Sequence, residues 1–391
     1  MDFQFDKIVN RENTDCVKYD LRSLHGMGDD VLPLWVADMD FECAPAVKRR
    51  LESIVRHNVY GYTFSPDSYY EAVMGWYERH FSFKSRKEWI ITSPGIVYAL
   101  AMAVNAYTKP GDGVLIQRPV YHPFSHVITK NERKIVNSPL RYENGHYGID
   151  FEDFERCAAR EDVKLFLLCS PHNPAGRVWT KEELVKMEEI CLANGVIVVS
   201  DEIHSDFVWE GRTHHVLLSL DEEYSKNVIV CTAPSKSFNI AGLQCSNLFI
   251  PDEELRKKFE AQNAKCFTPE LNVMGQAACQ AAYEEGEEWL EAVKAYIWEN
   301  LLFMEDHIRR NIPQIKMVHP EGTYLAWLDF NGLGLSDEER KDLIEKKAKL
   351  WLNDGAMFGP EGKGFERVNA ACPRVILQEA MDRLTKALES L

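Results

Sequence analysis

Hydrophobic residues gather in short runs between about residues 90 and 250, and longer segments with helical spacing separate these runs. None of the runs alternates strictly between apolar and polar residues, which is typical of strands buried on both faces. Helices between such strands indicate a mostly parallel sheet that is covered on both sides. The runs are WIIT (89–92), VLIQ (114–117), VKLFLLCS (163–170), VIVVS (196–200), NVIVC (227–231) and NLFI (247–250).

Two of the intervening segments carry clear helix signals. Residues 96–108 are apolar almost all round, which predicts a buried helix. Residues 180–195 begin with Thr180 as an N-cap, have Glu183 three positions later as in a capping box, and end at Gly195. This second pattern predicts a helix over nearly the whole segment.

The last third of the chain has a different pattern. It is helical from about 252 to 310 and then alternates between strand-like and helix-like segments. We therefore expect an α/β fold, with a large domain at 45–285 that holds a mostly parallel sheet of the seven-stranded type. A smaller α/β domain is expected from residues 1–44 and 286–391. The later segments are a strand at 321–332, an amphipathic helix at 336–355, a strand at 365–373 and a helix from 374 onward.

Composition and charge narrow the class of protein. The chain has 391 residues, of which 45% are hydrophobic and 27% charged, as in ordinary globular proteins. Its formal net charge of −16 argues against a nucleic-acid partner, because phosphate binding needs clustered Lys and Arg.

No apolar stretch approaches the roughly 20 residues that span a bilayer, and MDFQFDKIVN does not resemble a secretory signal. The ten cysteines form no Cys-x-x-Cys pair, so we expect a reducing, cytoplasmic location.

Polar segments of unusual composition follow five of the apolar runs. In open α/β sheets, ligands bind outside the carboxyl ends of the strands. Because each segment directly follows a predicted strand, we expect all of them to meet at one edge of one sheet. They are SPGIV (93–97), RPVYHPF (118–124), SPHNPAG (170–176), DEIHSD (201–206) and TAPSKSFNIAGL (232–243).

Three of these segments offer groups that could hold a ligand. Gly95, Ile96 and Val97 open a helix, where free N–H groups and the helix dipole favour a phosphate. Tyr121 offers a flat face for stacking, and Asn173 offers an amide for a ring substituent. Taken singly, the same residues also fit a Pro-Gly turn, a surface aromatic residue and an Asn-Pro turn.

Asp201 ends a fully apolar run, where a carboxylate is costly unless it meets a positive partner. A metal site formed by Asp201, His204 and Asp206 is one alternative, but no further ligand cluster supports it, and we expect no metal. A helix cap by Asp201 is another alternative.

Lys236 suggests a common purpose for these segments. A lysine amine can bond covalently to an aldehyde when burial or nearby positive charge lowers its pKa. Pyridoxal 5'-phosphate needs such a lysine, an acid for the ring nitrogen, a helix N-terminus for the phosphate and an aromatic residue for the ring. The five segments together supply all of these. The alternative, a solvated lysine in a loop, applies only to Lys236 taken alone.

Over essentially its whole length, the sequence resembles the aminotransferase superfamily of pyridoxal phosphate enzymes with fold type I. A narrower resemblance is to the C–S lyase branch, that is, cystathionine β-lyase-like and cysteine desulfhydrase-like enzymes. The motifs that carry it are LWVADMDF (34–41), VYGYTF (59–64), PVYHPF (119–124), DEIHSDF (201–207) and APSKSFNIAGLQ (233–244).

This resemblance implies roles for the residues that match the family's ring-binding positions. Lys236 would bond to the cofactor and shuttle protons, and Asp201 would pair with the pyridinium nitrogen. Tyr121 would stack on the ring and Asn173 would bond the ring hydroxyl. His204 stands where many aminotransferases have a tyrosine near that hydroxyl, which fits the lyase branch.

The resemblance also implies a phosphate site and a homodimer. Ser235, together with the amides of Ile96 and Val97 after Gly95, would hold the phosphate. No arginine follows Lys236 within ten residues to reinforce this site. Tyr62 matches a tyrosine that reaches the phosphate of the neighbouring subunit.

The substrate side is expected to depend on a small number of residues. Arg367 matches the arginine that binds the α-carboxylate of the substrate, and its planar guanidinium suits bidentate binding. Arg374 competes for this role, but the motif position favours Arg367. Trp35 and Tyr324 are expected to line the wall opposite the cofactor.

The implied activity is removal of a sulfur leaving group from the β-carbon of cystathionine, cysteine or an S-substituted cysteine, which yields pyruvate, ammonia and a thiol. An aminotransferase of amino acids is the rival, because both reactions begin with loss of the Cα proton. A regulatory protein that binds pyridoxal phosphate and acts by protein contact is the alternative from another class. It needs no proton shuttle, whereas this chain combines Lys236, Asp201 and Arg367.

Overall fold

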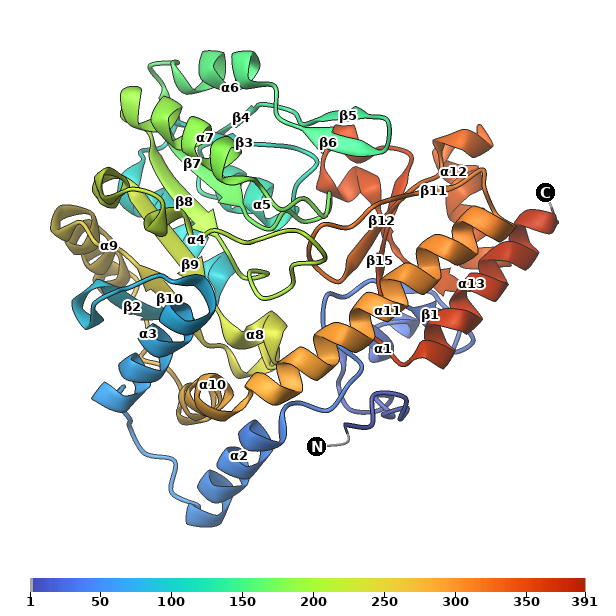
Figure 1. The fold of residues 1–391 in the computed structure, drawn as a ribbon, viewed down its shortest axis with the longest axis horizontal. Helices are drawn as coiled ribbons and strands as arrows, with labels where there is room; N and C mark the ends of the chain where they lie inside the picture. The colour runs from blue at the N-terminus through green and yellow to red at the C-terminus, as the bar shows by residue number, and fades with distance from the viewer. Residues whose placement is uncertain (1–2, 391) are drawn as a thin grey trace.

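A seven-stranded sheet forms the centre of the larger part of the molecule (Figure 1). The structure is a computed structural model and describes residues 3–390. The strand order is β2-β10-β9-β8-β7-β3-β4, and all strands run parallel except β10. The strands are β2 (Ile90–Ser93), β3 (Gly113–Ile116), β4 (Lys134–Asn137), β7 (Val163–Cys169), β8 (Ile197–Asp201), β9 (Val228–Thr232) and β10 (Ser246–Phe249).

Helices cover both faces of this sheet, and the side chains of its strands divide between two cores. Along β7, Leu165 and Leu167 belong to one apolar cluster, whereas Phe166 and Leu168 belong to the other. Successive strand residues point to opposite faces, so both faces need apolar residues. This explains why the sequence shows no strict alternation.

The helices on the two faces come from different parts of the chain. One face packs against α4 (Ile96–Tyr107), α5 (Pro123–Thr129) and α9 (Glu253–Lys265). The other packs against helices that include α3 (Asp67–Phe81), α6 (Phe151–Ala158), α7 (Lys181–Ala193) and α10 (Val273–Glu285). The predicted capping box of Thr180 and Glu183 is present at the start of α7.

A second, four-stranded antiparallel sheet lies in the C-terminal part, with the order β11-β12-β15-β14. Its strands are β11 (Lys316–Val318), β12 (Leu325–Asp329), β14 (Asn353–Asp354) and β15 (Phe365–Asn369). The long helix α11 (Glu287–Asn311) packs against α13 (Arg374–Glu389) beside it (Figure 1). In the N-terminal segment, β1 (Leu32–Pro33) pairs with β13 (Leu350–Trp351). The expected domain limits at 45–285, 1–44 and 286–391 stay a prediction.

The expected helix at 336–355 is wrong in its second half. The α-helix α12 (Asp337–Lys341) continues into a π-helical stretch, Asp342–Lys347, and the chain then turns at Lys349, which has a positive φ of 54°. Residues 350–354 form β13 and β14 instead. The reason is tertiary, because Leu350 pairs with Leu32, more than 300 residues earlier in the chain.

The remaining elements lie before the first strand of the large sheet or between its strands. They include α1 (Val17–Asp20), α2 (Pro45–His57), the hairpin strands β5 (Arg141–Glu143) and β6 (His146–Gly148), and the short α8 (Pro234–Ser237). Within residues 3–390, the structure contains no helix that is both long enough and apolar enough to cross a membrane. Nor do those residues contain a group of three or more His, Cys, Asp or Glu side chains that could hold a metal ion.

Candidate active site

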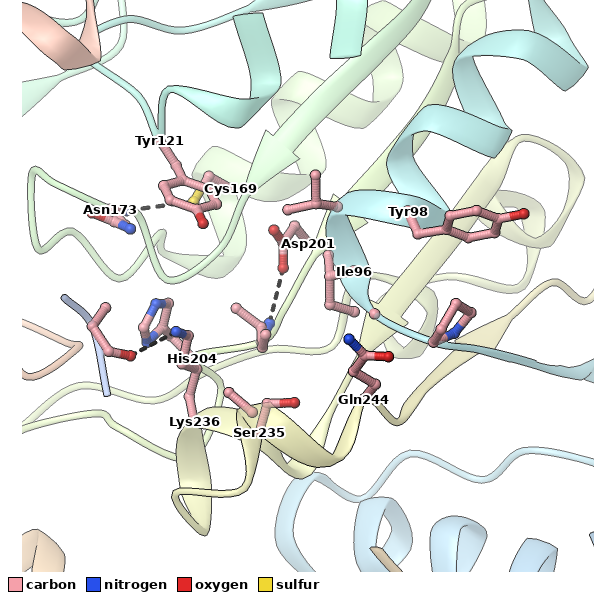
Figure 2. A pocket seen from close by; sticks show the side chains of 16 residues that line it. Ile96, Tyr98, Tyr121, Cys169, Asn173, Asp201, His204, Ser235, Lys236 and Gln244 are labelled. Carbon is pink, nitrogen blue, oxygen red and sulfur yellow. Dashed lines mark hydrogen bonds between the residues drawn. The ribbon is translucent and has the colours of Figure 1, made fainter. Parts of the chain in front are cut away.

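A cavity of about 480 Å³ opens at the carboxyl edge of the seven-stranded sheet (Figure 2). Its volume lies within the range of small-molecule sites. Residues from all five polar strand-end segments line it: Gly95, Ile96, Val97, Tyr121, Asn173, Asp201, His204, Ser235 and Lys236. The parallel strands bring these segments together because their carboxyl ends share one edge.

Lys236 projects its amine into this cavity from α8, the short helix that follows β9. The amine donates a hydrogen bond of 2.6 Å to the main-chain oxygen of Ala37, which Figure 2 draws as a dashed line. Burial lowers the pKa of Lys236 to about 8, although the charge of Asp38 opposes this shift. A substantial fraction of the amine is therefore neutral, and nucleophilic, near physiological pH.

Asp201 lies at the end of β8 and faces the same cavity (Figure 2). Its carboxylate accepts a hydrogen bond of 3.2 Å from the amide of Ile203. Burial raises the pKa of Asp201 to about 7. Among residues 3–390 no cation forms an ion pair with this carboxylate. A ligand with a positive group beside Asp201 would therefore be stabilised strongly.

Tyr121 and Asn173 form the opposite wall and are joined through the main chain, where the amide of Tyr121 donates to the oxygen of Asn173 over 2.9 Å. Burial raises the pKa of Tyr121, so the phenol stays neutral. The side-chain oxygen of Asn173 accepts from Arg367 over 2.9 Å. Its amide hydrogens remain for a ligand in the cavity.

The N-terminus of α4 forms one end of the cavity. Gly95 precedes the helix, and a Cβ atom placed there would meet no atom within 4 Å, so the approach to the first helical amides is open. The amides of Ile96 and Val97 belong to the first turn, whose N–H groups have no partner within the helix. They suit an anion such as a phosphate. Ser235 lines the same cavity.

His204 is buried in the cavity wall, and burial lowers its pKa well below the usual range. Its Nδ1 atom has no hydrogen-bond partner in the part of the chain described. The ring lies edge-on to Tyr324, with 5.8 Å between the ring centroids. His204 is therefore a neutral imidazole with a free polar atom.

Arg367, on β15 of the four-stranded sheet, does not itself line the cavity but contacts Asn173, which does. Its guanidinium donates to Asn173, to the main-chain oxygen of Trp35 over 3.0 Å and to Asn353, and it lies 4.9 Å from the ring centre of Phe358. Burial lowers the pKa of Arg367 to about 10, so the group stays charged. Its Nε atom has no partner among the described residues, and no acidic side chain pairs with it.

The other residues expected on the substrate side are placed differently. Trp35 stacks its indole on Trp351, with 4.3 Å between ring centroids, and the indole is not part of the cavity lining. Tyr324 is buried and donates to the oxygen of Ala37 over 2.9 Å. Arg374 donates to Asn300 over 2.6 Å and lies away from the cavity.

Tyr62 lies between α2 and α3, fully exposed, and does not line the cavity. Other large apolar side chains nearby are exposed as well: Val55, Val59, Tyr60 and Phe64. A partner molecule would be needed for Tyr62 to act in a site, so its role stays a prediction.

The sequence interpretation missed several residues of the cavity. Gln244 lies near Ser235 in Figure 2, and Ala37, Cys169 and Ile203 also contribute to the wall. Gln244 ends the segment that contains Lys236, so its position eight residues later could have marked it. Ala37 lies within the motif LWVADMDF (34–41), but the motif does not show that its main-chain oxygen contacts Lys236.

Comparisons with known proteins agree with this geometry. Residues 29–384 match the family "Aminotransferase class I and II". The chain belongs to this family.

Full-length relatives have more specific names. The chain is 44% identical to "Cystathionine beta-lyase PatB" of Bacillus subtilis (strain 168), over 98% of this chain and 99% of that protein. It is 31% identical to "Protein MalY" of Escherichia coli (strain K12), over the full length of both. The structure also superposes on cystalysin from Treponema denticola, which contains pyridoxal 5'-phosphate, with a TM-score of 0.96, 38% identity and complete coverage of both chains.

Proposed function

We propose that this protein is a carbon–sulfur β-lyase that depends on pyridoxal 5'-phosphate. Its reaction is α,β-elimination of cystathionine, cysteine or S-substituted cysteines to pyruvate, ammonia and a thiol. The observation that carries the proposal is that a partly neutral Lys236 amine and an Asp201 carboxylate without an ion pair line one cavity. The names of the full-length relatives favour the lyase over the other activities of the family.

The residues around the cavity fit this cofactor. The Lys236 amine suits its aldehyde, and Asp201 suits a protonated ring nitrogen, since burial without a cation raises the pKa of this carboxyl group. Tyr121 suits the ring face, while Asn173 and His204 offer polar atoms for the ring hydroxyl. The amides of Ile96 and Val97, with Ser235 and Gln244, suit the phosphate.

The bound cofactor supplies an electron sink that makes the Cα proton of an amino acid acidic. Once the amino group of the substrate has taken its place on the cofactor, the free Lys236 amine would take this proton as a general base. Arg367 binds the α-carboxylate and orients the Cα–H bond. The Cβ–S bond breaks with its electron pair going to sulfur, which leaves as the thiolate and is protonated. Water then converts the remaining three-carbon fragment to pyruvate and ammonia.

The proposal extends to the oligomeric state and the cellular location of the protein. The protein acts as a cytoplasmic homodimer in which Tyr62 of each subunit reaches the neighbouring phosphate site. The full exposure of Tyr62 and the exposed apolar residues around it support this arrangement.

Lys236→Ala is the decisive test. Turnover should fall by at least about 10²–10⁴-fold, because both the covalent anchor and the general base are lost. Borohydride reduction followed by peptide mass spectrometry should find the cofactor on Lys236 in the natural protein and on no peptide of the variant. An active variant, or cofactor attached to a different lysine, would contradict the assignment.

A second measurement separates the lyase from an aminotransferase. Purified protein is incubated with cystathionine or a cysteine conjugate, without a keto-acid acceptor. Pyruvate and thiol should appear in equal amounts. Product that forms only when an acceptor is added would favour transamination, and no turnover of any amino acid would favour the regulatory alternative.

A further inference from the structure

The segment Trp35–Phe41, here called the strap, crosses between the two sheets beside the active site. Its main-chain oxygens accept hydrogen bonds from side chains of both parts of the molecule. From the large sheet's side, Lys236 binds the oxygen of Ala37, and Asn239 binds the oxygens of Met39 (3.0 Å) and Phe41 (2.8 Å). Asn239 also accepts from the amide of Met39 over 2.9 Å.

The small sheet holds the same strap from the other side. On β15, Arg367 binds the oxygen of Trp35, and Asn369 donates to the oxygens of Val36 (2.6 Å) and Asp38 (2.5 Å). These two oxygens flank that of Ala37. The orientation of the Ala37 peptide is therefore set by Asn369, while its oxygen is shared between Lys236 and Tyr324.

Charged side chains fasten the outer part of the strap. The carboxylates of Asp38 and Asp40 are bound by Arg11, and Asp40 is also bound by Lys18 over 2.6 Å. Lys18 and Asp40 are both almost completely buried. A buried pair of this kind favours a single arrangement of its segment, because separating the charges would leave each of them uncompensated.

We propose that the strap is a positioning element that holds the Lys236 amine at the place from which it transfers a proton. Asn239 and Asn369 are its positioning residues. They touch the strap, and neither lines the cavity. The same element joins the Lys236 side of the site to Arg367, so that base and carboxylate-binding group keep a fixed separation. This inference rests on the proposed role of Lys236 as the proton carrier.

Asn239→Gly removes the three side-chain contacts without straining the main chain, since Asn239 has a φ of 55°, a region where glycine is relaxed. We expect kcat to fall about 10–100-fold, the effect of misplacing a catalytic group by about 1 Å. The Kd of the cofactor should change little, because its proposed contacts come from other residues. Asn144→Gly, at an exposed hairpin position with a φ of 52°, is the control for added chain flexibility.

Asn369→Asp removes both donors to the strap while keeping the size of the side chain. Its matched control is Asn300→Asp, because Asn300 is equally buried and also donates to two main-chain oxygens, those of Ala370 and Cys372, outside the strap. We expect a fall in kcat for Asn369→Asp and a clearly smaller one for Asn300→Asp. Equal falls would mean that any buried Asn→Asp change disturbs the enzyme, and would overturn the proposal.

A double-mutant cycle tests whether the strap acts as one element. Once Asn239→Gly has released it, adding Asn369→Asp should cost much less in kcat than it does alone. Adding Asn300→Asp to Asn239→Gly should give independent effects. If the effects on kcat are additive in both double variants, the contacts of Asn239 and Asn369 with the strap are not coupled, and this part of the proposal is wrong.

Hydrogen exchange of the amides at 36–40 gives a readout that needs no turnover. In cofactor-free protein, Asn239→Gly should accelerate this exchange, and Asn144→Gly should not. Faster exchange with unchanged kcat would show that the strap does not position the base. If the natural protein transaminates instead, the proposed lyase function fails, but the same kcat comparison is made on that reaction, because both begin with the same proton transfer.

Discussion

The two proposed halves of the active site, one for the cofactor and one for the substrate, are built in different ways. The cofactor half consists of side chains and amides at the ends of consecutive strands, such as Asp201 after β8 and Lys236 after β9. The substrate half consists of Arg367 from another sheet and main-chain oxygens of the strap, more than 300 residues earlier in the chain. The residues of the cofactor half can be predicted from the local sequence, because each follows a strand. The substrate half forms only when the two sheets pack together in the folded protein.

The buried carboxylates differ in the same way. Asp40 in the strap is as buried as Asp201, but it has Arg11 and Lys18 against it. Asp201 forms no ion pair within the described chain, and burial raises its pKa to about 7, although the charge of Lys236 opposes this shift. A buried carboxylate that is paired with cations favours one arrangement of its segment. A buried carboxylate without an ion pair favours the binding of a positively charged ligand.

The largest effect expected after loss of Lys236 itself is that of Asp201→Asn. The variant keeps the size of the side chain but cannot stabilise a positive ring nitrogen, so kcat should fall by at least about 10²-fold. Steady-state pyruvate release measures this fall. Asp206→Asn is the control, since Asp206 is buried nearby but contacts Ser237 and Trp76 outside the cavity. Equal losses in both variants would remove the special role of Asp201.

Arg367→Lys tests the substrate half. Lysine keeps the charge but not the planar fork, so the KM of the amino acid should rise about 10–100-fold, with a smaller change in kcat. Initial rates over a range of substrate concentrations separate the two constants. Arg374→Lys should leave KM nearly unchanged, because Arg374 lies away from the cavity. The reverse result would assign the carboxylate to Arg374.

Tyr62→Phe tests whether the cofactor half is completed by a partner molecule. Loss of one hydrogen bond to a charged phosphate should weaken cofactor binding by roughly tenfold. Equilibrium titration of cofactor-free protein measures the Kd, and sedimentation reports whether the protein is a dimer. Tyr60→Phe, two residues earlier and also exposed, is the matched control. If Tyr62→Phe is a dimer and its Kd for the cofactor is unchanged, Tyr62 does not contact the phosphate.

The mildest test changes no residue. Because burial disfavours the ammonium form, the Lys236 amine in cofactor-free protein should react with an acylating reagent half-maximally near pH 8. An unperturbed lysine would do so near pH 10.4. Peptide mapping after a short exposure at each pH measures the reaction at Lys236. Half-maximal reaction near pH 10 would show that the cavity does not lower the pKa of this amine.

Sequence patterns anticipated the cofactor half better than the substrate half. Nine residues expected there line one cavity, because each was identified by its place after a strand and by its motif. The indole of Trp35 was expected in the wall, but it stacks on Trp351 instead. Tyr324 reaches the site through Ala37, whose contribution no side-chain pattern could reveal.

Some elements of the fold also required the tertiary structure. The strand β4 at Lys134–Asn137 was not among the apolar runs, because it lies at the edge of the sheet and Lys134 is exposed. The antiparallel direction of β10 and the strands at 350–354 depend on pairing with distant partners.

By itself, the sequence determined the mostly parallel sheet, its helices and the chemistry at the strand ends, because hydrophobic spacing and local motifs act over a few residues. Only the tertiary structure decided how Arg367, the strap and Lys236 meet, because hydrogen bonds to main-chain oxygens depend on where two distant segments lie and leave no mark in side-chain composition.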